Sequence, residues 1–180
     1  MLNDKIALVT GATRGIGRAI ALELGKQGAT VIGTATSEGG AGQISAYLAE
    51  AGVKGKGVVL NVTDVAQTDA VLADLAKEFG AVTVLVNNAG ITRDNLTMRM
   101  GDDEWDAVID TNLKAVFRLS RGVMRGMMKA RFGRIVNISS VVGYSGNAGQ
   151  ANYCAAKAGV AGLSRRSEEH TSELQSRQVI

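Results

Sequence analysis

Hydrophobic residues gather in five short runs along the chain, and a helical pattern follows each run. The runs are Lys5–Thr10, Thr30–Ala35, Lys56–Asn61, Val82–Asn87 and Arg134–Ser139. They are apolar throughout rather than alternating, which is typical of strands covered on both faces. Five strands that alternate with helices predict an α/β fold with a doubly wound parallel sheet, a Rossmann-type three-layer α/β/α arrangement.

The helices are predicted from apolar residues at helical spacing. The first places Ile16, Ile20 and Leu24 on one face and stops at Gly28. The others are expected over 41–51, after a cap at Thr63 or Asp64, over 102–131 with an apolar stripe that includes Trp105 and Phe117, and from about Gln150. The segments 88–101 and 141–149 read as loops.

Composition and charge exclude several classes of function. The chain has 180 residues, 46% of them hydrophobic, and a net charge of +3 without a basic block, so we expect one domain and no nucleic-acid partner. Cys154 and His170 are the only residues of their types, so neither a disulfide nor a metal site is expected. No apolar run reaches membrane-spanning length, and the first strand begins too early for a signal peptide, which favours a cytoplasmic protein without a membrane partner.

A glycine-rich turn separates the first strand from the first helix. Thr10–Gly17 reads TGATRGIG. Gly11 would allow the tight turn, Gly15 would let the backbone approach a diphosphate, and Gly17 would let the helix pack close to the sheet. Free N–H groups at the helix start would face the anion, so we expect a dinucleotide site here rather than a plain turn.

The end of the second strand favours NADP over NAD. An NAD site usually carries Asp or Glu there to bind the ribose hydroxyls, but this stretch reads Thr34, Ala35, Thr36, Ser37. Small hydroxyls and Arg14 could bind a 2′-phosphate. The alternative is that Arg14 merely points to water.

Three residues near the end of the chain predict carbonyl chemistry. Tyr153 and Lys157 are four residues apart and therefore share one helical face. An ammonium beside a phenol favours the phenolate, so Tyr153 could act as acid and base near neutral pH. Ser140 is expected at the end of the fifth strand, where ligands bind in open sheets, and its hydroxyl could hold a carbonyl oxygen.

Together these motifs resemble the short-chain dehydrogenase/reductase family. The resemblance rests on TGATRGIG, on NNAG at Asn87–Gly90, on Asn112 and Ser140, and on YCAAK from Tyr153. The stretches 87–100 and 146–159 are similar to the 3-oxoacyl-acyl-carrier-protein reductases of fatty-acid synthesis. The likeness covers about residues 3–165.

The resemblance implies reduction of a 3-oxoacyl thioester on acyl-carrier protein with NADPH. Tyr153 would protonate the ketone oxygen, Lys157 would bind the nicotinamide ribose, Ser140 would orient the carbonyl, and Asn112 would help hold a proton-relaying water. Ser139 is the rival serine, but Ser140 lies thirteen residues before the tyrosine, as in the family. The implied cofactor site comprises Gly11, Thr13, Arg14, Gly15, Ile16, Gly17, Thr36, Asn61, Val62, Asn88, Ala89, Gly90, Tyr153 and Lys157. The full-length parent would be a homotetramer.

The pattern departs from the family after Arg165. Residues 166–176 read RSEEHTSELQS, which is polar and resembles a translated sequencing adapter. We therefore expect a truncated reductase domain at 1–165 and a non-native or disordered tail at 166–180. The family's sixth and seventh strands and substrate-covering helices have no counterpart here. The sheet is thus expected to be incomplete after its fifth strand and the following helix, and the chain to fold poorly or to be inactive.

Other functions remain open at this point. Another short-chain reductase, acting on acetoacetyl-CoA or a different ketone, would share every motif named above. A sugar-nucleotide epimerase of the extended family also has Tyr-x-x-x-Lys, but its usual G-x-x-G-x-x-G spacing disagrees with Gly11, Gly15 and Gly17. A non-catalytic NADP-binding protein would normally lack one of the three chemical residues, although an inactive NADP-binding fragment would keep them.

Overall fold

The computed structural model describes residues 1–166 and contains a parallel sheet of five strands. Its order is β3-β2-β1-β4-β5, and each neighbouring pair is parallel. The strands are β1 (Ile6–Val9), β2 (Thr30–Ala35), β3 (Gly55–Val59), β4 (Val84–Asn87) and β5 (Arg134–Asn137). The predicted doubly wound fold is confirmed, and β5 forms one edge of the described sheet.

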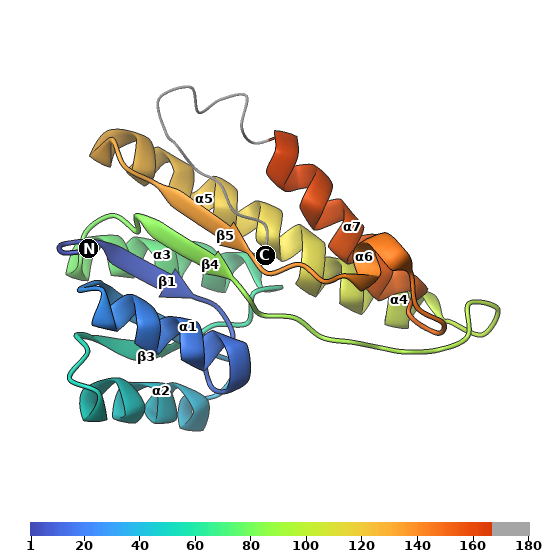
Figure 1. Ribbon diagram of the computed structural model, residues 1–180, viewed down its shortest axis with the longest axis horizontal. Coiled ribbons are helices and arrows are strands. Elements are labelled where there is room, and N and C mark those ends of the chain that lie inside the picture. The colour runs from blue at the N-terminus through green and yellow to red at the C-terminus, as the bar shows by residue number, and fades with distance from the viewer. Residues whose placement is uncertain (167–180) are drawn as a thin grey trace.

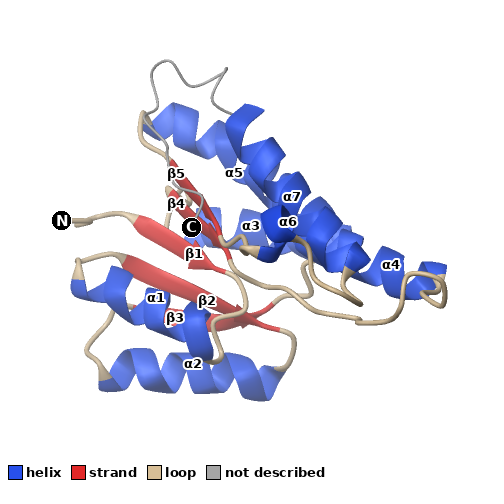
Figure 2. Ribbon diagram, turned by 45° about the vertical axis from the view of Figure 1, so that its right-hand side comes forward, coloured by secondary structure: helices blue, strands red, loops and turns tan. Residues whose placement is uncertain are grey.

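Helices cover both faces of the sheet (Figures 1 and 2). One face carries α1 (Gly15–Lys26) and α2 (Glu38–Glu50), and the other carries α3 (Val65–Glu78) and α5 (Ala115–Ala130). Successive residues of β1 divide between two hydrophobic clusters, since Ala7 and Val9 pack toward α1 and α2 while Leu8 packs toward α3 and α5. Asp64 caps α3 by accepting a hydrogen bond from the backbone of Gln67, as predicted.

The long helix predicted over 102–131 forms, but it is not a uniform α-helix. It consists of α4 (Asp102–Ile109), a π-helical segment η1 (Asp110–Lys114) and α5, and it ends at Arg131 in a left-handed conformation. Trp105 and Phe117 lie outside its buried face, with 39% and 45% of their surface exposed. The predicted stripe was therefore wrong at both positions.

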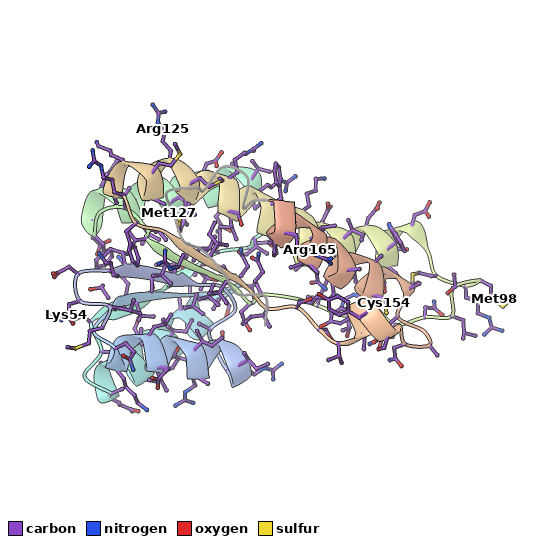
Figure 3. All side chains as sticks on the ribbon, turned by 45° about the horizontal axis from the view of Figure 1, so that its top comes forward. Lys54, Met98, Arg125, Met127, Cys154 and Arg165 are labelled. Atoms are coloured by element: carbon purple, nitrogen blue, oxygen red, sulfur yellow. The ribbon has the colours of Figure 1, made fainter. Side chains whose placement is uncertain are left out.

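Beyond η1 a row of buried positions recurs every four residues, at Ala115, Leu119, Val123 and Met127, and Val116 is buried beside it. Phe117 lies on another side of the helix and is exposed. Met127 points from α5 toward the sheet, and Arg125 points away from it (Figure 3).

The first helix also turns differently from the prediction. Gly17 and Ala21 are its buried residues, and Ile16 is 62% exposed. A Cβ placed on Gly17 would overlap the Gly11 carbonyl oxygen, so the glycine side of the helix faces the turn. Since neighbouring residues on a helix are rotated by roughly 100°, Ile16 faces outward.

Two helices follow β5, where the sequence predicted a loop and one helix. The unpredicted element is α6 (Val142–Ser145), and α7 (Ala151–Arg166) begins next to the predicted Gln150. A Cβ placed on Gly143 would lie 3.0 Å from the Lys157 carbonyl carbon, so α6 packs directly on α7. Together with α4 they extend beyond the end of the sheet (Figure 1).

Within residues 1–166, every helix is too short or too polar to cross a membrane. The predicted tail at 166–180, with His170, lies outside the described residues apart from the backbone of Arg166, which is the last residue of α7.

Candidate active site

The predicted site residues gather at one edge of the sheet. Because all five strands are parallel, the segments that follow them emerge at the carboxyl edge, where ligands bind in open α/β sheets. The order reverses between β1 and β4, so the turn after β1 and the segment 88–90 flank the switch point. The predicted residues follow the strands in this way: 11–17 after β1, Thr36 after β2, Asn61 and Val62 after β3, 88–90 after β4, and Ser140 after β5.

The glycine turn has the geometry that its sequence predicts. Gly11 and Gly15 have φ values of +64° and +57°, which L side chains rarely adopt. A Cβ on Gly11 would lie 3.0 Å from the Ala89 Cα atom, so this glycine lets the turn approach β4. A Cβ on Gly15 would meet nothing within 4 Å. Gly15 therefore leaves open space at the helix start, and Arg14 beside it is exposed.

Asn88 and Thr10 join the two sides of the switch point. The Asn88 side-chain amide donates to the carbonyl oxygens of Thr10 and Gly11, both at 2.9 Å. In return the Thr10 hydroxyl accepts hydrogen bonds from the backbone N–H groups of Asn88 and Ala89, both at 3.0 Å. Asn88 thus has the structural role that accompanies its predicted binding role, and Thr10 is a support that sequence reasoning missed.

The segment after β2 divides into a buried support and an exposed surface. Thr34 is buried, and it accepts hydrogen bonds from the backbone of Gly11 at its hydroxyl (3.3 Å) and of Ala12 at its carbonyl oxygen (2.9 Å). Its hydroxyl therefore holds the turn. Thr36 and Ser37 are exposed, and Ser37 caps α2 by accepting from the backbone of Gly40 at 3.1 Å.

The two residues predicted after β3 differ in exposure. Asn61 is exposed, and its side-chain oxygen accepts hydrogen bonds from the backbone and hydroxyl of Thr63 at 3.1 and 2.8 Å. Val62 is buried and packs in one hydrophobic cluster with Leu60 and Leu75. Asn61 thus offers an accessible surface, whereas the Val62 side chain belongs to the core.

Tyr153 and Lys157 lie on one face of α7, as predicted. The Lys157 Nζ atom is 5.6 Å from the centre of the Tyr153 ring and donates to the Ile138 carbonyl oxygen at 2.6 Å. Lys157 is only 6% exposed, and burial lowers the pKa of its ammonium. Lys157 therefore lies beside the tyrosine in a dry setting, where an electrostatic contact between the ammonium and a phenolate is stronger than in water.

The two serines after β5 make different contacts. β5 ends at Asn137, so both serines lie beyond the strand and neither ends it, in contrast to the prediction for Ser140. The Ser139 hydroxyl donates to the Lys157 carbonyl oxygen at 3.3 Å, whereas the Ser140 hydroxyl accepts from the backbone of Val142 at 3.4 Å. Ser139 therefore fastens the loop to α7, whereas within residues 1–166 the Ser140 hydroxyl donates to no backbone group.

Asn152, which sequence reasoning also missed, anchors the start of α7. It is fully buried, and its amide donates to the carbonyl oxygens of Arg93 (2.9 Å) and Glu104 (3.1 Å). The residue before Tyr153 thus ties the helix to the loop 88–101 and to α4. Buried polar groups need partners, but the identity of these partners depends on the tertiary fold.

Asn112 is buried in η1, and both polar ends of its side chain bind one neighbour. Its amide donates to the Ile91 carbonyl oxygen and its oxygen accepts from the Ile91 backbone N–H, both at 2.8 Å. A Cβ placed on Gly90 would lie 3.2 Å from the same oxygen. The side chain therefore holds the segment after β4 against the long helix, which is a structural role beside the water-holding role that the resemblance implies.

Among residues 1–166, no group of three or more His, Cys, Asp or Glu side chains could hold a metal ion. Cys154 is a free thiol of intermediate exposure on α7 (Figure 3).

Comparison with known proteins agrees with this geometry. The family model for short chain dehydrogenases matches residues 5–179. The chain belongs to the short chain dehydrogenase family. Its curated relatives in this family include the 3-oxoacyl-[acyl-carrier-protein] reductases FabG of Vibrio harveyi, Escherichia coli K12 and Pseudomonas aeruginosa, which are 64%, 65% and 58% identical. The matches cover 91%, 89% and 91% of this chain and 66%, 65% and 66% of the relatives, so the chain spans just under two thirds of their length.

Proposed function

We propose that the protein represented by this chain reduces 3-oxoacyl groups on acyl-carrier protein, with NADPH, in fatty-acid synthesis. Identity of 58–65% to three relatives that bear the name of that reductase supports the substrate class. The observation that carries the proposal is that the glycine turn at the switch point and the buried Lys157 beside Tyr153 lie at the same edge of the sheet.

The turn fits a dinucleotide with a 2′-phosphate. Gly15 leaves open space at the start of α1, where unpaired N–H groups and the helix dipole favour an anion. Arg14 and Thr36 are exposed for the 2′-phosphate, and the first carboxylate after β2 is Glu38, in the first turn of α2. Asn61, Ala89 and Gly90 would border the adenosine, and Thr13 and Ile16 would line the turn.

Three side chains would act on the ketone. When bound, NADPH would supply the hydride that adds to the carbonyl carbon. Tyr153 donates its hydroxyl proton to the carbonyl oxygen, and the Lys157 ammonium stabilises the phenolate that remains. Ser140 donates a hydrogen bond to the same oxygen and so orients the carbonyl. Asn112 contributes by fixing the segment after β4, and it would hold a relay water through η1.

The proposal extends to assembly and location, as the family resemblance implies. The protein would work in the cytoplasm as a homotetramer, with acyl-carrier protein as its partner and with neither nucleic acid nor membrane. Phe117 and Met128 support an assembly surface, since α5 exposes 45% and 64% of these two apolar side chains.

The decisive experiment joins residues 1–165 to the part of the E. coli relative that the chain does not cover. NADPH oxidation would be followed with 3-oxobutyryl-carrier protein, acetoacetyl-CoA and a simple ketone. We expect the carrier-protein thioester to be the best substrate, and Tyr153→Phe to lower kcat by about 10²–10⁴-fold without loss of folded structure. Preference for the simple ketone, or equal rates with the carrier-protein thioester and acetoacetyl-CoA, would overturn the proposal.

A further inference from the structure

Tyr47 reaches from α2 to the glycine turn. It is 6% exposed, and its hydroxyl donates to the Ala12 carbonyl oxygen at 2.8 Å in a buried hydrogen bond. Side chains on a helix lean toward its N-terminus, and α2 begins at the carboxyl edge of the sheet just after β2. Tyr47 therefore contacts the turn from the interior of the protein, below the edge at which ligands bind.

The peptide unit that follows Ala12 is fixed by this contact. The Ala12 N–H donates to the Thr34 carbonyl oxygen at 2.9 Å, so Ala12 is held on both sides. In a trans peptide the carbonyl and the next N–H point in opposite directions. A carbonyl held inward by Tyr47 thus turns the Thr13 N–H outward. Among residues 1–166, no group accepts a hydrogen bond from that N–H.

In the folded chain Thr13 lies beside the segment that joins β2 to α2. A Cβ placed on Gly40 would lie 3.5 Å from the Thr13 hydroxyl and 3.3 Å from the Ser37 hydroxyl. The outward N–H therefore belongs to the end of the site that would receive the adenosine ribose, rather than the nicotinamide.

We propose that Tyr47 is a positioning residue for coenzyme choice, because its hydroxyl orients the Ala12–Thr13 peptide so that the Thr13 N–H can donate to the 2′-phosphate of NADPH. The inference rests on the NADP site proposed above. Burial raises the pKa of the Tyr47 phenol more than Arg18 lowers it, so the hydroxyl stays a donor at neutral pH. The Arg18 guanidinium lies 4.8 Å from the ring centre and covers the aromatic ring.

The test is Tyr47→Phe in the 180-residue chain, with NADPH and NADH binding measured by fluorescence titration. Phenylalanine keeps the ring and its contact with Arg18 and removes only the hydroxyl. We expect the Kd for NADPH to rise about fivefold and that for NADH to change less than about twofold. The pair 2′,5′-ADP (adenosine 2′,5′-bisphosphate) and 5′-AMP, which differ only in the 2′-phosphate, should show the same contrast.

Ser45→Ala is the matched control. Its hydroxyl also ties α2 to its surroundings, donating to the Ala41 carbonyl oxygen at 3.2 Å and accepting from the Gly57 backbone at 2.9 Å, but it does not touch the turn. This variant should keep the wild-type preference for NADPH.

Equal weakening of both coenzymes by Tyr47→Phe, or no weakening of either, would overturn the inference and leave the proposed function standing. If circular dichroism shows that the unsubstituted chain is folded and it still binds no NADPH, the proposed cofactor and this inference are both overturned.

Discussion

Replacing Thr10 with valine tests whether one buried hydroxyl holds the switch point together. Thr10 is 1% exposed, and its hydroxyl accepts from two backbone N–H groups, those of Asn88 and Ala89. Valine keeps the shape but accepts nothing. Each unsatisfied buried donor costs about 1–3 kcal/mol, and the added methyl group returns about 0.8 kcal/mol. For two donors the net cost is therefore about 1–5 kcal/mol, and because both donors are only partly buried we expect no more than the middle of this range, about 3 kcal/mol in the free energy of unfolding.

Urea unfolding of the 180-residue chain, followed by circular dichroism, measures this loss. With a slope of about 2 kcal/mol per molar urea, the midpoint should fall by about 1.5 M in Thr10→Val. Thr10→Ser keeps the hydroxyl and loses one methyl, so its midpoint should fall by only about 0.5 M. If the two variants unfold at the same urea concentration, the hydroxyl does not hold the junction and the reasoning is refuted.

Two further changes probe the other end of the site. Because burial lowers the pKa of Lys157, the unfolded chain binds more protons than the folded one just below the ordinary lysine pKa of 10.5. The stability of the wild type relative to Lys157→Met should therefore rise as the pH approaches that value from below, and a flat or falling difference in urea midpoints would contradict this. Gly143→Ala should lower the free energy of unfolding by about 1–3 kcal/mol, because its Cβ would press on the backbone of α7 at Ala158. Gly39→Ala, in open space on α2, should raise it by about 0.5–1 kcal/mol. Thermal unfolding compares the two variants, and equal melting temperatures would count against the packing argument.

The strands were the most predictable part of the fold, for a physical reason. A strand covered on both faces must be apolar at almost every position, so a continuous apolar run predicts it, and β2 occupies the predicted residues Thr30–Ala35. No comparable sequence pattern predicts the short helix α6. Its four residues form where Gly143 packs on Lys157, and that contact depends on the approach of two segments rather than on local pattern. The π-helical turn around Asn112 likewise has no local sequence pattern that predicts it, and it lies where that residue binds Ile91, 21 residues earlier in the chain.

The candidate site divides in the same way. The tight turn could be predicted because it needs residues that adopt positive φ, and Gly11 and Gly15 do so. Thr10, Tyr47 and Asn152 could not, since each acts through a group far away along the chain. A general rule gives one signal, because a buried tyrosine hydroxyl normally has a partner, but the rule does not say that the partner of Tyr47 is the turn at Ala12.

The segment after β4 joins the two ends of the site, and this makes its contacts informative. Asn88 grips the glycine turn, and three residues later the Ile91 backbone is held by Asn112. The next residue of η1, Leu113, packs against Gly159 of α7, the helix that carries Tyr153 and Lys157. The nucleotide turn and the chemical pair are therefore connected through one short segment. A change at Thr10 or Tyr47 acts on the turn before this connection, so its primary effect should be on coenzyme affinity. A change at Asn112 acts on the connection itself, and it should alter the fit of both ends together.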